Sequence, residues 1–178
     1  MPSTASTAVP SAPDPLAEAH RQWTNHFSAD GADGLATVTS AAHIARLLRQ
    51  GAEDALAPYN ISYAHFELLT LVMWSRSGGL PMNKISSRLQ LPPASLTHTV
   101  GKLEKAGLVA RVPDPKDKRS LLVCITDQGI ALAAAAGPAL NAFYESLSLT
   151  AGEQTQLQQV AKKLRQQAGE LAKDSPSA

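Results

Sequence analysis

MNKISSRLQLPPASLTHTVGKLEKAGLVARVPDPKDKRSLLVCI, residues 82–125, carries the clearest structural pattern of the sequence. Within it, Leu96, Val100 and Leu103 recur at steps of four and three, a spacing that places side chains on one face of a helix. The pattern therefore predicts a helix over 94–106 that buries these three residues.

The segments on either side of this helix complete a recognisable order of elements. A shorter helix fits 82–89, and Gly107 stands where a helix commonly ends. The runs 108–112 and 120–125 favour strands, and the charged segment 113–119 between them predicts a hairpin with a long tip. A helix, a turn, a second helix and a hairpin in this order predict a winged helix-turn-helix with a two-stranded wing.

Helices are also expected before this module. Apolar residues at steps of three and four predict a helix over 15–27 and a longer one over 35–57. Two Gly and two Asp in 28–34 favour turns, so a break is expected between the two helices. Ser62 is placed to cap a further helix, which Gly78-Gly79 is expected to end.

Two long helices are expected after the hairpin. The first runs over 126–147, with a bend at Gly137-Pro138. The second opens with Thr150-Ala-Gly-Glu153, which has the spacing of a capping box. Its apolar stripe is typical of a helix that packs against another helix, and consists of Leu157, Val160, Leu164, Ala168 and Leu171.

Composition limits the classes of protein to be considered. The 178 residues suffice for a hydrophobic core, and aromatic residues are only 4% of them, which favours a mostly α fold packed through Leu, Val, Ile and Ala. The one cysteine, Cys124, cannot form an internal disulfide, and we expect it to be a buried, inert thiol. With no apolar stretch near the roughly 18 residues of a membrane span and no signal peptide, we expect a cytoplasmic protein without membrane contact, metal or cofactor.

Positive charge is concentrated on the winged module. The whole chain has a net charge of +1, but residues 81–119 hold eight Lys or Arg against three acidic residues, a net charge of +5. The remainder holds eight positive and twelve negative side chains, a net charge of −4. Such a distribution is typical of a nucleic-acid-binding module, because phosphate contacts supply most non-specific affinity, although a merely solvated basic face gives the same count.

The helix over 94–106 favours the nucleic-acid interpretation. With its apolar face buried, its outward side is small and polar in the first half and basic in the second. This suits a helix in the major groove of duplex DNA, with polar groups at base edges and lysines on phosphates. The candidate contacts on this helix are Ser95, Thr97, His98, Lys102 and Lys105.

From Ile61 to Gly129 the sequence resembles the MarR family of winged-helix regulators. The resemblance rests on His65-Phe-Glu-Leu-Leu69, on the run from Ser95 to Arg111 with its Leu-Glu-x-x-Gly-Leu-Val, on Asp114-Pro-Lys-Asp-Lys-Arg-Ser120 and on Ile125-Thr-Asp-Gln-Gly129. Each fragment alone is weak evidence for the family, but the combination at these intervals is specific. The resemblance implies a regulator that binds double-stranded DNA as a homodimer, with repression the commoner outcome in the family.

The same resemblance assigns roles outside the helix. It implies that Arg119 at the wing tip enters the minor groove while Asp117 holds its guanidinium, with Lys116 and Lys118 beside them. The negative potential of a narrow groove suits such a cation. It also implies that the terminal helices of two chains interlock, although packing within one chain would give the same apolar stripe.

The expected organisation follows from these patterns. It comprises a disordered tail over 1–13, N-terminal helices for dimerisation over 14–60, a DNA-binding winged helix-turn-helix over 61–126, C-terminal dimerisation helices over 127–173 and a tail over 174–178.

An effector site is a further expectation from the resemblance. The additional N-terminal helix is similar to that of a subgroup that responds to urate and related purines. Trp23, Glu67, His98 and Arg111 stand at the positions of that subgroup's effector pocket, with Glu67 where Asp is usual and His98 where Arg is usual. A small aromatic anion other than a purine, or no ligand, stays open.

Two other functions compete with DNA binding. A winged helix can serve as a protein–protein interaction module with no DNA target, and this alternative stays open. An enzyme would need a catalytic cluster, and the sequence has no Gly-rich phosphate loop, no nucleophile elbow and no metal-ligand spacing among its histidines.

Overall fold

The computed structural model describes residues 14–76, 78–115 and 120–170. The tails expected over 1–13 and 174–178 lie outside these ranges, as do the wing-tip residues 116–119. The described helices are α1 (Pro15–His26), α2 (Ala29–Leu56), η1 (Ala57–Tyr59), α3 (Tyr63–Met73), α4 (Met82–Leu89), α5 (Pro93–Lys105), α6 (Asp127–Glu145) and α7 (Ala151–Gln167), and the strands are β1 (Gly79–Pro81), β2 (Val109–Pro113) and β3 (Leu121–Ile125).

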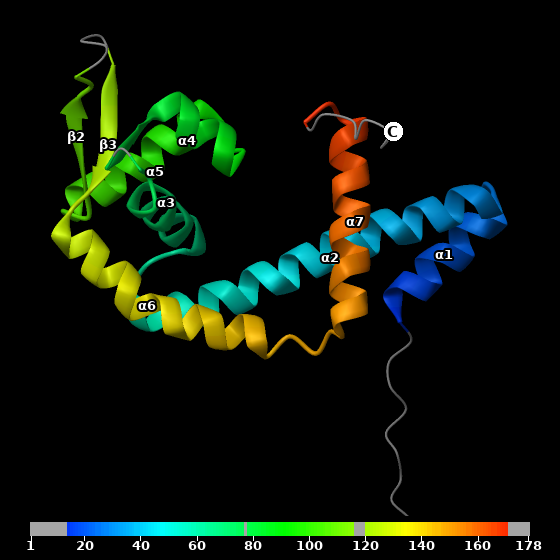
Figure 1. The fold of residues 1–178 in the computed structure, drawn as a ribbon. Coiled ribbons are helices and arrows are strands. Elements are labelled where there is room, and N and C mark those ends of the chain that lie inside the picture. The colour runs from blue at the N-terminus through cyan, green and yellow to red at the C-terminus, as the bar shows by residue number, and fades with distance from the viewer. Residues whose placement is uncertain (1–13, 77, 116–119, 171–178) are drawn as a thin grey trace, which may run out of the picture.

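The chain forms a winged lobe joined to long helices. Figure 1 shows α3, α4, α5 and the sheet gathered at one end, with the β2–β3 hairpin projecting from them. Helices α2 and α6 lie side by side and lead away from the lobe, and α1 folds back on α2 at the far end. The mostly α, winged helix-turn-helix fold expected from the sequence is confirmed.

The sheet has one more strand than the expected hairpin. Strand β3 lies in the middle and pairs antiparallel with β2 and with β1, in the order β1-β3-β2. Gly79 lies opposite Cys124, where a β-carbon on residue 79 would collide with the sulfur atom. Sequence periodicity did not predict β1, because three residues that end in proline are too few to show an alternating pattern.

The start of α2 corrects the expected break over 28–34. The helix begins at Ala29, because the Ser28 hydroxyl caps it by accepting a hydrogen bond from the Gly31 amide at 3.1 Å. Asp30 lies in the first turn, where an acidic side chain interacts favourably with the positive end of the helix dipole. Residue types that favour a turn also favour a helix N-terminus, and here they form the latter.

Helix α3 begins as expected and ends early. Ser62 caps it, accepting from the His65 amide at 3.2 Å, and the His65 ring accepts from the Ser62 amide in return. The helix ends at Met73 rather than at Gly78-Gly79, and Trp74 donates its amide to the Thr70 carbonyl at 3.0 Å. Gly79 belongs to β1 instead.

Side chains from both the lobe and the long helices form one core. Helices α2 and α6 contribute to it near their junction with the lobe, and α6 continues through Pro138 without interruption. The buried apolar residues of this cluster are Ala52, Leu56, Ile61, Leu68, Leu69, Val72, Leu80, Ile85, Leu96, Val100, Leu103, Leu108, Val109, Val123, Ala133, Ala136 and Leu140.

The last helix contributes no buried residue to this core. Its capping box is formed as expected, with Thr150 and Glu153 exchanging hydrogen bonds. Leu157, Val160 and Leu164 remain 42%, 53% and 57% exposed within the single chain. Packing within one chain therefore does not account for this part of the apolar stripe.

Candidate nucleic-acid interface

Helix α5 presents the side that its sequence pattern predicts. Leu96, Val100 and Leu103 are 1%, 0% and 1% exposed, so three core contacts fix the rotation of the helix about its axis. The outward side then carries the candidate contacts from the helix start to its last turn. Ser95, Thr97, His98, Lys102 and Lys105 are all exposed.

Threonine hydroxyls on α5 are bound to its own backbone. Thr97 donates to the Pro93 carbonyl and Thr99 to the Ser95 carbonyl, each at 2.9 Å. Such bonds fix the side-chain rotamer and consume the hydroxyl proton. Thr97 is thereby left with a methyl group and oxygen lone pairs for an incoming partner.

A titratable residue of α3 lies close to the basic part of this face. Burial lowers the pKa of His65, and the nearby charges of Lys102 and His98 lower it further, while Glu53 opposes them. Lys102 on α5 therefore lies close enough to α3 for its charge to act on a side chain of that helix. His65 belongs to the family-like sequence fragment but was not singled out as a site residue.

The base of the wing is tied to α5 by an ion pair. Arg111 on β2 donates to the Glu104 carboxylate on α5 at 2.8 Å, and both side chains are half-buried. Arg111 was expected to serve an effector pocket, and in this chain its partner is Glu104. The pair connects the orientation of the hairpin to that of the helix.

Glu67 lies next to a hollow between α2, α3 and α6. Burial raises the pKa of Glu67, while the Arg49 charge and a hydrogen bond with Tyr63 act in the opposite direction. The Tyr144 hydroxyl donates to that of Tyr63 at 3.3 Å. The hollow of about 250 Å³ beside these groups is lined by Ala45, Leu48, Arg49, Ala52, Tyr63, Phe143, Tyr144 and Leu147.

Trp23 lies far from the other expected effector residues. It is on α1, at the end of α2 remote from the lobe (Figure 1), with its ring centroid 4.6 Å from that of Phe27. A single chain therefore does not bring Trp23 together with Glu67, His98 and Arg111. The wing-tip candidates Lys116, Asp117, Lys118 and Arg119 lie outside the described residues.

Sequence reasoning missed Arg49 and Tyr63, which act on Glu67, and Tyr144, which is hydrogen-bonded to Tyr63. Arg49, Tyr63 and Tyr144 come from three helices, and no short motif connects them. The four-residue step from Tyr63 to Glu67 was the one local signal available, because it places both side chains on one face of α3.

The described residues also bear on a reactive cysteine, a metal site and a membrane-spanning helix. Cys124 is half-buried in β3, and burial raises the pKa of its thiol, which disfavours the reactive thiolate. Across the described residues, no cluster of three or more His, Cys, Asp or Glu has the geometry for a metal ion. None of the helices described is both long and apolar enough to span a bilayer.

Known proteins resemble this chain in sequence. The sequence model of the MarR family matches residues 61–121. The uncharacterised HTH-type transcriptional regulator YkoM of Bacillus subtilis (strain 168) is 38% identical over 63 residues, which are 35% of this chain and 41% of YkoM. The match thus spans less than half of that relative's length.

Solved structures resemble the chain over more of its length. Sco5413 of Streptomyces coelicolor, described as a MarR family transcriptional regulator, is 34% identical with a TM-score of 0.70, and the match covers 79% of this chain and 99% of Sco5413. A mutant of Escherichia coli MarR complexed with operator DNA is 22% identical with a TM-score of 0.66, covering 80% of this chain and 96% of that one. At that lower identity, the likeness establishes the fold alone.

Proposed function

Because the chain belongs to the MarR family of transcriptional regulators, we propose that it binds double-stranded DNA sequence-specifically as a cytoplasmic homodimer, most simply as a ligand-responsive repressor. Family members are regulators and not enzymes. The observation that carries the proposal is the outward side of α5. Its buried residues leave small and polar groups exposed in its first half and Lys102 and Lys105 exposed in its second.

Each part of the lobe has a role in this proposal. The first half of α5 enters the major groove, where Ser95, Thr97 and His98 meet base edges. Lys102 and Lys105 bind phosphates, and the Arg111–Glu104 pair holds the wing at a fixed angle to α5. The wing, with Lys116, Asp117, Lys118 and Arg119, then reaches the adjacent minor groove.

The homodimer is supported by apolar surface that one chain leaves uncovered. Leu157, Val160 and Leu164 are exposed on α7, and Ile44 and Leu47 are exposed on α2. Burial of such surface is the main favourable contribution to association. A hollow of about 410 Å³ lies between these helices, lined by Ile44, Leu47, Leu48, Leu147, Ser148, Leu149, Glu153 and Leu157.

Two-fold symmetry then dictates the form of the DNA site. A dimer presents two copies of α5, so its operator is pseudo-palindromic, with half-sites centred about 34–36 Å apart, one helical turn of DNA. A mutant of E. coli MarR, a protein of the same fold, has been solved in complex with operator DNA, which supports DNA binding by this fold.

An effector would act at the junction between the long helices and the lobe. The hollow beside Arg49 and Tyr63 has an apolar wall, a cation and phenol hydroxyls, which suit a small aromatic or purine anion. A ligand there would change the angle between α2 and α3, and so the separation of the two α5 helices. For Trp23 to contribute, it must come from the second copy. A thermal-shift screen of purines and aromatic acids tests this role, since a ligand bound only by the folded state raises the melting temperature.

DNA binding is tested by its salt dependence. We expect a 30-base-pair duplex of random sequence to bind at 50 mM salt and to bind much more weakly at 200 mM, because counterions compete for phosphates. Replacing Lys102 and Lys105 by Gln removes these lysines from both subunits of the dimer, so the slope of log Kd against log salt should fall by about 3.6, at roughly 0.9 per phosphate contact.

The control removes the same charge elsewhere. Lys162→Gln with Lys163→Gln, on α7, should leave the slope unchanged. Absence of binding at 50 mM salt would favour the protein–protein interaction module, and an unchanged slope in the α5 variant would remove α5 from the interface. Fluorescence anisotropy of labelled duplex measures the binding at 50 mM salt and the salt slope of each variant.

A further inference from the structure

An exposed tryptophan stands beside three cations on the lobe. Trp74 follows the end of α3 and is 74% exposed, the largest exposed fraction among the large apolar side chains of the described residues. It lines a hollow of about 380 Å³, which we call the Trp74 hollow, and the other lining residues are Ser75, Arg76, Leu80, Lys84 and Arg88. The side chains of the three cations are exposed, and the function proposed above uses none of these residues.

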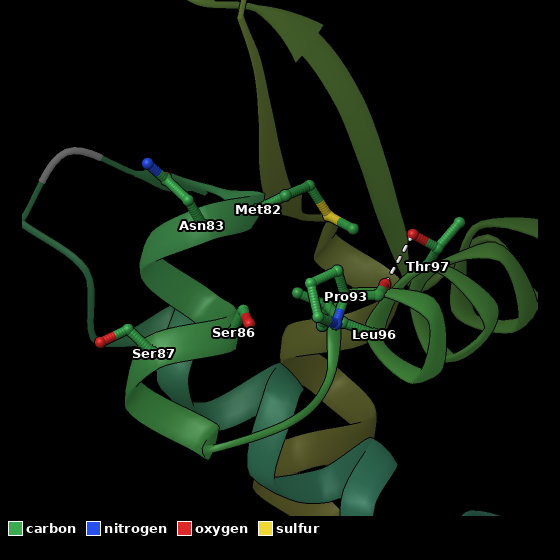
Figure 2. A pocket seen from close by; sticks show the side chains of 7 residues that line it. All are labelled: Met82, Asn83, Ser86, Ser87, Pro93, Leu96 and Thr97. Carbon is green, nitrogen blue, oxygen red and sulfur yellow. Dashed lines mark hydrogen bonds between the residues drawn. The ribbon is translucent and has the colours of Figure 1, made fainter. Parts of the chain in front are cut away.

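Helix geometry places the Trp74 hollow on the side of α4 that faces away from α5. Residues four positions apart lie on one face of a helix, so Lys84 and Arg88 share a face, whereas Met82, two positions before Lys84, lies roughly opposite. Figure 2 shows that opposite face, with Met82 pointing toward Thr97 of α5 across a separate hollow. The lining of this second hollow has no charged residue and no residue in common with the Trp74 hollow.

The turn after α3 is held in place by hydrogen bonds. The Trp74 amide donates to the Thr70 carbonyl at 3.0 Å, and the Ser75 hydroxyl donates to the Gly79 carbonyl at 3.1 Å. Gly79 and Leu80 belong to β1, which is fixed in turn by its pairing with β3. A ligand that enters a hollow with fixed walls orders little of the protein, so little affinity is lost to conformational entropy.

The charges around the Trp74 hollow favour an anion. Residues 74–91 contain three Lys or Arg and no Asp or Glu. Among the ion pairs formed between described residues, none uses Arg76, Lys84 or Arg88. Guanidinium groups bind phosphate oxygens through paired N–H donors, and the ammonium group adds a third positive charge. Three cations around one hollow suit a compact ligand with several negative charges.

The indole of Trp74 adds a flat surface on which a planar ring can stack. Aromatic side chains stack on any nucleic-acid base, provided that a face of the base is free. The bases of duplex DNA are stacked on one another, so a duplex offers phosphates to this hollow but no free ring. A single nucleotide offers both. The volume of about 380 Å³ is near the lower end of the range for small-molecule sites, which fits one nucleotide.

We propose that the Trp74 hollow binds one nucleoside diphosphate, with the base stacked on Trp74 and the phosphates held by Arg76, Lys84 and Arg88. The two phosphates carry about three negative charges at neutral pH, which matches the three cations. Stacking on an indole does not select one base, so the proposal specifies the class of ligand. Neither α5 nor the wing takes part, so this binding goes beyond the proposed function and does not depend on it.

The fluorescence of Trp74 reports on its own site. The chain has two tryptophans, so Trp23→Phe leaves Trp74 as the reporter. Adenosine diphosphate at low salt should change its emission and saturate at one nucleotide per chain. Adenosine and inorganic phosphate each supply only part of the ligand and should bind much more weakly. Isothermal titration calorimetry measures the same affinities on the wild-type chain.

Two variants separate the stacking contact from the phosphate contacts. Trp74→Ala should weaken binding of adenosine diphosphate about 5- to 150-fold, the loss expected for one base–aromatic stack, and leave binding of pyrophosphate unchanged. Arg76→Gln with Arg88→Gln should weaken binding of both ligands roughly 10-fold, because each exposed cation contributes modestly. The control, Lys162→Gln with Lys163→Gln, removes equal charge from α7 and should leave both affinities unchanged.

Three results would overturn the proposal. If duplex DNA changes the Trp74 emission and adenosine diphosphate does not, the cations belong to the DNA interface. If a short single strand of thymidylate binds and the diphosphate does not, the hollow takes a nucleic-acid strand. If Lys102→Gln with Lys105→Gln abolishes nucleotide binding and Arg76→Gln with Arg88→Gln does not, the nucleotide binds on α5. None of these results decides whether the chain binds an operator, which the salt dependence of duplex binding tests separately.

Discussion

Gly129→Ala should destabilise the fold because Gly129 lies against the start of β2. Its amide donates to the Thr126 hydroxyl at 3.1 Å in the first turn of α6. A β-carbon at this position would overlap the Leu108 carbonyl oxygen and lie 2.7 Å from Cγ1 of Ile125. The Leu108 carbonyl also accepts a hydrogen bond from the Thr126 amide at 3.1 Å, so moving it disturbs a second contact.

The size of the effect follows from three contributions to the free energy of unfolding. Forcing a methyl group into a packed site typically costs about 1–3 kcal/mol. Weakening the bond between Thr126 and Leu108 costs about 1 kcal/mol more. Alanine recovers about 1 kcal/mol through its greater helix propensity. The net loss is about 2 kcal/mol, which lowers the melting temperature by roughly 4–8 °C in a chain of this length.

Gly34→Ala is the matched control. Gly34 also lies inside a helix, α2, but a β-carbon there meets nothing within 4 Å. Only helix propensity changes, so the free energy of unfolding of this variant should rise by about 1 kcal/mol and its melting temperature by roughly 2–4 °C. The same chemical change thus has opposite signs at two helical glycines, and thermal unfolding followed by circular dichroism measures both.

A particular result would refute this reasoning. If Gly129→Ala melts at or above the wild-type temperature, as Gly34→Ala is expected to, then α6 does not begin against Leu108. The contact between Leu108, at the base of the wing, and helix α6 would then not be formed in the folded protein.

Two further predictions concern association and pH. Val160→Glu with Leu164→Glu should convert a dimer to monomers in sedimentation velocity, because the new charges lie in the apolar stripe of α7. The control, Thr155→Glu with Gln158→Glu, lies off that stripe and should leave the dimer intact. Equal effects of the two double variants would refute the interface. The raised pKa of Glu67 means that the folded chain binds more protons than the unfolded one above pH 4.5. The contribution of Glu67 to stability therefore falls as pH rises from 4.5 through its folded pKa. Glu67→Gln should abolish this fall and melt at a higher temperature than the wild type at pH 7. The same dependence of melting temperature on pH in both proteins would contradict this prediction.

The sequence by itself determined the elements whose signals are local. Leu96, Val100 and Leu103 were assigned to the core from spacing alone, and Ser62 and Thr150 cap the helices they were expected to cap. Periodicity and capping depend on residues within four positions of each other, so the chain carries this information before it folds. The outward side of α5 followed from the same pattern.

Tertiary structure decided whatever depends on residues far apart in the sequence. The segment 28–34 has a composition suited to a turn or to a helix start, and α1 packs against the resulting helix, with His20 hydrogen-bonded to Asp33. Strand β1 exists because β3 offers an edge to pair with. Arg111 met Glu104, seven positions earlier, only when the wing returned to α5.

The candidate site divides in the same way. The basic residues on α5 could be predicted from the sequence, whereas the hollow beside Arg49 and Tyr63 required α2, α3 and α6 to pack together. A local pattern fixes which side of a helix faces the core, because that depends on one helix alone. Which groups meet on the outside depends on how helices and strands pack together, and no short-range pattern encodes that.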